Sequence, residues 1–243
     1  MLGCDDADGR IIEVVAKLRG REMNMKMQIA ELITALFAPD VGIVSATPVL
    51  VEIPAEFHTI IGDRSISQTV TASSGLNFGT VNLGEFTTWV VGQAPSGVQR
   101  DQAAAIFAFD VLIQNADRRA SNPNVWARAG QLGVFDHDQA FTFLALPIIG
   151  GAPKPWIPAD QVQGFAFLKE HVFYSGLKGK IFDLEPFEMA LAALTDTQLE
   201  SYLQAVPPEW RQEKGYSKQI VEYLAESRSE AKRLVSFAKH VLR

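Results

Sequence analysis

Residues 115–124 read NADRRASNPN, and residues 134–138 read VFDHD. In the first stretch, Asp117 and Asn122 have the spacing D-x-x-x-x-N. Phosphoryl-transfer sites of the kinase type use this spacing because the carboxylate orients the attacking hydroxyl and the amide oxygen binds Mg²⁺. A second carboxylate must hold the metal ion, and Asp136 is the candidate. The two stretches therefore predict that Asp117 is catalytic and that Asn122 and Asp136 are metal ligands.

The segment between these stretches predicts a β-hairpin. Two short apolar runs flank Ala129–Gly130, which has the composition of a tight turn. If these two residues form the turn, Arg128 pairs with Gln131. Counting outward along the antiparallel strands then makes Asn122 and Asp136 neighbours at the strand ends.

The beginning of the chain predicts a strand, a helix and a strand, over Ile11–Leu18, Met25–Phe37 and Pro48–Ile53. Lys17 lies near the end of the first strand, where a kinase places the lysine that meets the α- and β-phosphates of ATP. Glu31 lies on the following helix, where a glutamate would pair with that lysine. Both residues are therefore predicted to contact the nucleotide site.

Glu52 and Ile53 end the second strand, directly before Pro54. They are predicted to form the connector between two lobes and to offer backbone groups to adenine. Residues 1–53 would then form a small N-lobe and residues 54–243 a larger C-lobe. The stretch from Pro54 to Gly97 is rich in Ser, Thr and Gly, and we expect it to be irregular, with short helical or strand pieces.

The rest of the C-lobe predicts mainly helices. A strongly apolar one covers Arg100–Gln114 and leads into the D-x-x-x-x-N loop. A capping box is expected at Thr197–Glu200. Three further helices are expected at Asp183–Leu194, Thr197–Ala205 and about Ser217–Leu242.

Residues 109–124, FDVLIQNADRRASNPN, closely resemble a stretch of the stand-alone HipA-like kinase family that precedes a hairpin ending in Asp-His. Residues 74–79, SGLNFG, resemble a second element of that family, and residues 207–210, PPEW, resemble a third. The resemblance extends from about Gly9 to Arg243.

The resemblance implies an α+β, bilobal protein-kinase-like fold with a small β-rich N-lobe and a mainly helical C-lobe. It implies Asp117 as the catalytic residue, Asn122 and Asp136 as metal ligands, and Lys17 with Glu31 at the phosphates. ATP and Mg²⁺ would be required, and the phosphate acceptor would be a protein Ser or Thr hydroxyl or a small molecule.

The chain departs from the usual kinase pattern before Lys17, where only Gly3 and Gly9 are available and no G-x-G-x-x-G loop occurs. Either the phosphate loop is minimal, or a glycine-rich loop lies upstream of Met1. A catalytically weak pseudokinase or an ATP-binding interaction module is therefore the alternative to an active kinase.

Asp136-His137-Asp138 also contains the His-Asp dyad of metal-dependent phosphohydrolases and the D-x-D of some glycosyltransferases. A phosphohydrolase would need further histidine ligands, for which His58 and His171 are the candidates. A D-x-D glycosyltransferase would bind a nucleotide sugar through Mn²⁺, and the rest of the sequence offers no further motif for it.

Composition narrows the classes of partner. The net charge is −6, and the Lys and Arg residues are interleaved with acidic or apolar ones, so nucleic acid is not the expected partner. The single cysteine, Cys4, excludes an intramolecular disulfide. Neither a signal peptide nor a membrane-spanning run is evident, and the sequence predicts a soluble, cytoplasmic protein without a membrane partner.

Overall fold

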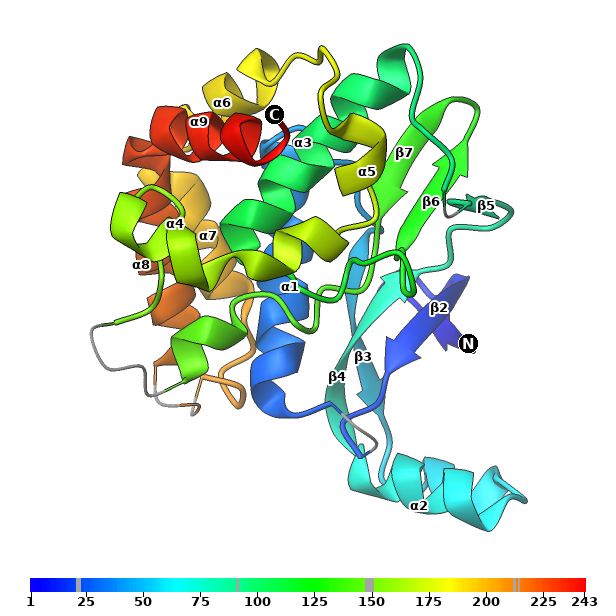
Figure 1. The fold of residues 1–243 in the computed structure, drawn as a ribbon. Coiled ribbons are helices and arrows are strands. Elements are labelled where there is room, and N and C mark those ends of the chain that lie inside the picture. The colour runs from blue at the N-terminus through cyan, green and yellow to red at the C-terminus, as the bar shows by residue number, and fades with distance from the viewer. Residues whose placement is uncertain (21–22, 91, 147–150, 212, 214) are drawn as a thin grey trace.

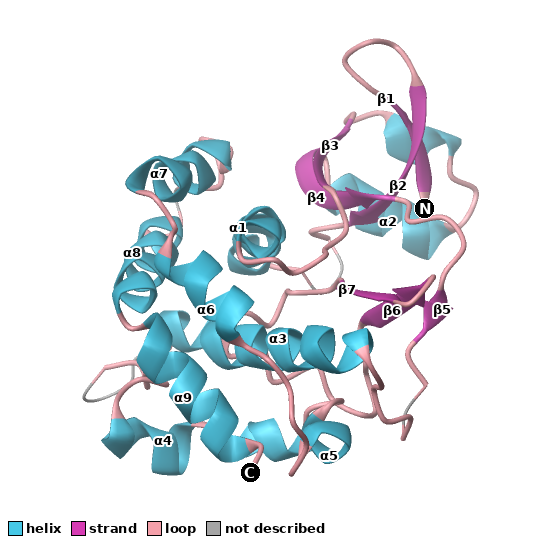
Figure 2. Cartoon of the chain, turned by 90° about the horizontal axis from the view of Figure 1, so that it is seen from above, coloured by secondary structure: helices cyan, strands magenta, loops and turns pink. Residues whose placement is uncertain are grey.

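The computed structural model describes residues 1–20, 23–90, 92–146, 151–211, 213 and 215–243. Strands gather at one side of the molecule and most of the helices at the other (Figures 1 and 2). The family resemblance predicts this α+β arrangement of a β-rich part and a helical part, and the structure confirms it.

Four antiparallel strands form the larger sheet, in the order β1-β2-β4-β3. The sequence predicts β2 and β3, which the structure confirms, but it leaves β1 unassigned and β4 inside an irregular stretch. Their bounds are β1 Leu2–Asp5, β2 Ile11–Lys17, β3 Pro48–Ile53 and β4 Gly75–Val81.

The sequence does not assign β4 as a strand because Gly75, Asn77 and Gly79 have low strand propensity. Tertiary packing explains one of these glycines: a Cβ on Gly79 would lie 2.8 Å from the Val51 side chain and 3.2 Å from the Val15 carbonyl oxygen. Since β4 pairs with both β2 and β3, a lobe boundary at residue 53 would separate it from its own sheet.

Two short helical elements, the 3₁₀ helix Phe57–Ile60 and α2 (Arg64–Ala72), connect β3 to β4. The side chain of Asp63 caps α2 by accepting a hydrogen bond from the Ile66 amide at 2.9 Å. In Figure 1, α2 lies at the lower end of the sheet, away from the C-terminal helices.

The helix α1 (Met25–Asp40) packs between the sheet and the C-terminal helices (Figure 1). Asn24 caps its first turn by accepting a hydrogen bond from the Met27 amide at 3.1 Å. The sequence predicts an end at Phe37, before Pro39. The helix instead includes Pro39 and ends at Asp40.

The helix α3 (Val98–Ile113) is the buried centre of the helical part. It leads through the loop at residues 114–124 to β6 (Val125–Arg128) and β7 (Gln131–Val134). The predicted hairpin register is confirmed, since Arg128 pairs with Gln131 and Val125 with Val134. A two-residue strand, β5 (Thr87–Thr88), adds to the outer edge of β6.

Helical elements make up most of the chain after β7, as predicted. Two details differ from the prediction. The expected long helix is broken at Glu230 into α8 and α9, and the capping box joins Thr195 to Gln198 rather than starting at Thr197. The bounds are the 3₁₀ helices Thr142–Ala145 and Ala166–Glu170, and α4 Pro158–Gly164, α5 Tyr174–Leu177, α6 Glu185–Ala192, α7 Asp196–Ala205, α8 Tyr216–Ser229 and α9 Ala231–Val241.

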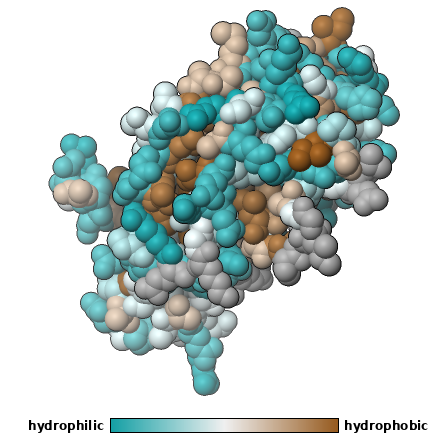
Figure 3. All heavy atoms as spheres, turned by 90° about the vertical axis from the view of Figure 1, so that its left-hand side faces the viewer, coloured by the Kyte–Doolittle hydropathy of each residue, from teal (hydrophilic) through white to brown (hydrophobic). Residues whose placement is uncertain are grey.

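One large hydrophobic core joins α1, α3 and the C-terminal helices, and a small one, of Val14, Val51, Ile53 and Val70, lies between the sheet and α2. The surface over the helical side alternates apolar patches with hydrophilic residues (Figure 3). Within the described part of the chain, no helix has the length and apolar character needed to cross a bilayer.

Candidate functional site

Lys17 is the centre of a charge network between the two parts of the fold. It lies at the end of β2, and its ammonium donates hydrogen bonds to Glu31, on α1, and to Asp136, just after β7. Lys17 and Asp136 are 119 positions apart in the sequence. The fold therefore brings together three residues that the sequence predicts for one site.

The network favours the charged forms of Lys17 and Glu31. Burial by itself would lower the pKa of Lys17, but Glu31 and Asp136 outweigh it, and the pKa is raised. Burial would likewise raise the pKa of Glu31, but the contact with His137 and the charge of Lys17 lower it to about 2. A charged lysine in this position can neutralise part of the charge of a polyphosphate.

Asp136 is held in an uncommon backbone conformation. Its φ of 61° is in the left-handed region, which non-glycine residues seldom adopt. The following residue, His137, is buried against Phe109 on α3, and its Nδ1 lies 3.7 Å from a Glu31 carboxylate oxygen. The buried histidine thus anchors the chain beside Asp136 and leaves the carboxylate directed toward Lys17.

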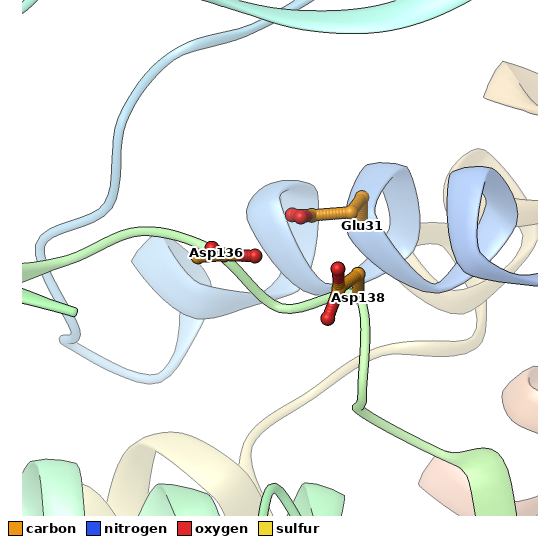
Figure 4. Close-up of side chains that lie close together, drawn as sticks. All are labelled: Glu31, Asp136 and Asp138. Atoms are coloured by element: carbon orange, nitrogen blue, oxygen red, sulfur yellow. The ribbon is translucent and has the colours of Figure 1, made fainter. Parts of the chain in front are cut away.

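Asp138 belongs to the same cluster, although the sequence did not assign it a role in the kinase site. Carboxylate oxygens of Glu31, Asp136 and Asp138 lie within 4.8 Å of one another, and Figure 4 shows Glu31 pointing from α1 toward the segment that carries the two aspartates. Burial and the charge of Asp136 raise the pKa of Asp138. Such a group of oxygen donors has the chemistry that Mg²⁺ prefers.

The loop after α3 places Asp117 and Asn122 side by side. The Asn122 amide donates a hydrogen bond to an Asp117 carboxylate oxygen at 2.6 Å, and Asn115 accepts one from the Asp117 backbone N–H at 3.1 Å. Asp117 is about one quarter exposed, so it can meet a substrate. The strand pairing of the hairpin ends at Val125 and Val134, before it reaches Asn122 and Asp136. That these two residues are neighbours therefore stays a prediction.

A buried ionic group that the sequence reading missed supports this loop. Arg118 donates through Nε to Asp110, on α3, at 2.6 Å, and its Nη1 donates to the carbonyl oxygens of Asn124 at 2.6 Å and Phe135 at 3.2 Å. His171 completes the group, 3.0 Å from Asp110. Arg118 therefore ties the loop that carries Asp117 to the residue that precedes Asp136.

The charge states in this group follow from burial and pairing. Burial alone would raise the pKa of Asp110, but Arg118 and His171 lower it. Burial lowers the pKa of His171 despite the nearby carboxylate. A signal for the group was present in the sequence, because an aspartate within the apolar run of α3 needs a buried partner.

A cavity of about 260 Å³ opens beside Lys17. Apolar side chains from both parts of the fold form most of its wall, which also includes the charged residues Lys17, Glu31 and Asp136. The apolar and polar residues of the wall include Val15, Ala35, Ala46, Phe78, Val81, Asn82, Leu83, Phe86, Phe135 and His137.

Glu52 and Ile53, the predicted adenine connector, do not line this cavity. They lie in β3, paired with Leu76 and Gly75 of β4, and border a different cavity under β1. Their predicted contact with adenine stays a prediction, and it would require the base to lie outside the cavity beside Lys17. Asn82 and Leu83, which follow β4, border the cavity instead.

The phosphohydrolase alternative lacks its ligands in the described residues. His171 pairs with Asp110, His58 lies in the 3₁₀ helix after β3, and the carboxylate cluster contains no histidine. The arrangement therefore favours a site in which carboxylate oxygens, and not imidazole nitrogens, would bind a cation.

Comparison with known proteins and families places the chain in a family. No curated protein matches the chain. A family model described as HipA-like kinase matches residues 3–144, which is more than half of the 243 residues. The matched range contains Lys17, Glu31, Asp117, Asn122 and Asp136. The chain, with this lysine–glutamate–aspartate network between a β-rich and a helical part, therefore belongs to the HipA-like kinase family, whose members are kinase-type phosphotransferases.

Proposed function

We propose that the protein is an ATP- and Mg²⁺-dependent kinase that phosphorylates a Ser or Thr hydroxyl of a protein. The observation that carries the proposal is the Lys17 network in the wall of a mainly apolar cavity. An apolar slot that ends in a fixed positive charge suits a flat base joined to a polyphosphate. A small-molecule acceptor is the second possibility for the same chemistry.

In this proposal, the base lies among the apolar residues of the cavity, beside Asn82 and Leu83, and the phosphates lie toward Lys17. Glu31 keeps the lysine charged and oriented. Asp136 and Asn122 hold Mg²⁺, and Asp138 contributes a further carboxylate nearby. When bound, Mg²⁺ would neutralise part of the negative charge on the β- and γ-phosphates.

Asp117 acts on the acceptor. Its carboxylate accepts the proton of the acceptor hydroxyl, whose oxygen forms a bond to the γ-phosphorus as the bond to the ADP oxygen breaks. Asn122 supports this role because its hydrogen bond to Asp117 at 2.6 Å fixes the carboxylate. Arg118 supports it from the other side by holding the loop to α3.

The metal assignment is tested by Asp136→Ala. We expect Mg²⁺ to lose most of its effect on ATP affinity, because the variant removes a carboxylate from the cation site. The measurement is thermal stabilisation by ATP with and without Mg²⁺. Asp8→Ala, at an exposed carboxylate in the β1–β2 turn, is the control. Unchanged Mg-ATP affinity in Asp136→Ala would count against its ligand role.

The position of the base is tested by a matched pair of variants. Ala46 is buried in the cavity wall, so Ala46→Leu should fill part of the slot and weaken Mg-ATP binding by at least about tenfold. Glu52→Ala, at the connector predicted from sequence, should bind Mg-ATP like the wild type. Titration calorimetry measures both. If Glu52→Ala weakened binding and Ala46→Leu did not, the base would lie elsewhere.

A further inference from the structure

The larger sheet carries a cavity of about 710 Å³ under β1, which the proposed nucleotide site does not use. The first and last strands of the sheet, β1 and β3, both border this cavity, and each has one side without a strand partner. Its wall is largely apolar and only partly buried, and it includes Leu2, Ile12, Val49, Phe57 and Leu76. Such a cavity between two edge strands is suited to receive a further segment of polypeptide.

The charged side chains that border this cavity are all acidic. They are Asp5, the last residue of β1, the adjacent Asp6, and Glu52, in β3. No lysine or arginine lines the cavity within the described part of the chain. A segment that combines a large apolar side chain with basic ones would therefore complement the cavity in both hydrophobicity and charge.

Residues 178–182, KGKIF, between α5 and α6, form an exposed segment of this kind, which we call the KGKIF segment. Ile181 is 91% exposed, more than any other large apolar side chain in the described residues. Lys180, Lys239 and Arg243 border the same surface cavity as Ile181, and no acidic side chain of the described residues does so. The most exposed apolar side chain thus lies in a basic surface.

Backbone contacts hold the KGKIF segment in place on both sides of Ile181. The Gly179 amide donates to the Leu242 carbonyl at 2.8 Å, and the Asp183 amide donates to an Asp101 carboxylate oxygen at 2.9 Å. Gly179 has a φ of 70°, which residues with a side chain seldom adopt. Because the segment is already ordered, it would lose little conformational entropy on binding.

The KGKIF segment cannot reach the cavity of its own chain. It directly follows α5, and Figure 2 shows α5 and β1 on opposite sides of the molecule. We propose that the protein self-associates head to tail, with the KGKIF segment of one copy in the cavity under β1 of the next. Ile181 then packs against the apolar wall, and Lys180 lies beside Glu52.

The geometry of this contact predicts how the association behaves. Because the two surfaces differ, each copy in a dimer keeps one cavity or one KGKIF segment free for a further copy. A five-residue segment buries little surface, so the dissociation constant should be above about 1 μM. The inference is independent of the proposed function, because neither surface includes Lys17, Asp117 or Asp136.

The first test is sedimentation velocity of the full chain from about 1 μM to about 500 μM protein. Wild type should form dimers and larger species as the concentration rises, and about 500 mM salt should weaken the association by screening the charges. Ile181→Ser should raise the dissociation constant at least about tenfold. Ile60→Ser is the matched control, because Ile60 is 76% exposed and lies outside the cavity wall, and it should associate like wild type.

The second test reverses one charge on each surface. Glu52→Lys and Lys180→Glu should each associate more weakly than wild type, because each variant places like charges opposite each other. Mixed in equal amounts, the two variants should form a one-to-one complex, since the reversed cavity of one then meets the reversed segment of the other. Circular dichroism checks that every variant is folded.

Several outcomes would overturn the inference. They are a wild type that is monomeric at every concentration, equal dissociation constants for Ile181→Ser and Ile60→Ser, and a mixture of the charge variants that forms no complex. Undiminished association of both charge variants on their own would show that a different surface joins the copies, and it would overturn the inference as well.

Discussion

Asp117→Ala is expected to lower phosphoryl transfer by about 10²–10⁴-fold, which is the usual contribution of a general base. The carboxylate is the group that accepts the proton of the acceptor hydroxyl in the proposed reaction. Thermal stabilisation by Mg-ATP should persist, because Lys17 and the cavity wall are untouched. The measurement combines ADP release, phosphate incorporation into the protein and the thermal midpoint with and without Mg-ATP.

The control for this prediction is Asp8→Ala, which removes an exposed carboxylate far from the loop in the sequence. It should match the wild type in all three measurements. Equal turnover by Asp117→Ala and wild type would remove Asp117 from the catalytic role. Mg-ATP binding with no turnover by the wild type itself would instead favour the pseudokinase alternative.

Arg118→Ala is expected to lower the free energy of unfolding by about 3–5 kcal/mol, the usual effect of removing one partner from a buried ion pair. Both Arg118 and Asp110 have fully buried side chains, so solvent does not compensate for the lost charge. The carbonyl oxygens of Asn124 and Phe135 would also lose their donor. Urea denaturation followed by circular dichroism measures the change.

Arg119→Ala is the matched control, one position along the chain. The Arg119 side chain is half exposed and lies 3.6 Å from Asp117, so its loss should cost no more than about 1 kcal/mol. Equal losses in the two variants would show that the buried group does not stabilise the loop. A stable Arg118→Ala protein with lowered turnover would show instead that Arg118 acts by positioning Asp117.

Several features could be read from the sequence because they depend on local spacing. Asp117 and Asn122 share one short loop, so their separation fixes their proximity. The hairpin register follows from a two-residue turn, and the pairing of Arg128 with Gln131 confirms it. The order strand, helix, strand was sufficient to place Lys17 and Glu31 on facing elements, where they form an ion pair.

Other features were misread because intrinsic propensity and tertiary packing disagree. The glycines of β4 disfavour a strand in isolation, but strand partners on both sides make it one. Because β4 was not expected, the connector was assigned to Glu52 and Ile53, which the structure places at the end of β3, paired with β4. The helix also breaks at Glu230, between α8 and α9, where no proline or glycine indicates a break in the sequence.

The sequence by itself determined the family, and it placed Asp117 and Asn122 in one short loop, because both are encoded in short motifs. Only the tertiary structure decided which distant groups meet: Asp136 with Lys17, and His171 with Asp110. The physical reason is that such contacts join residues far apart in the chain. Their geometry is set by the packing of α1 and α3 between the sheet and the C-terminal helices, and no local pattern encodes that packing.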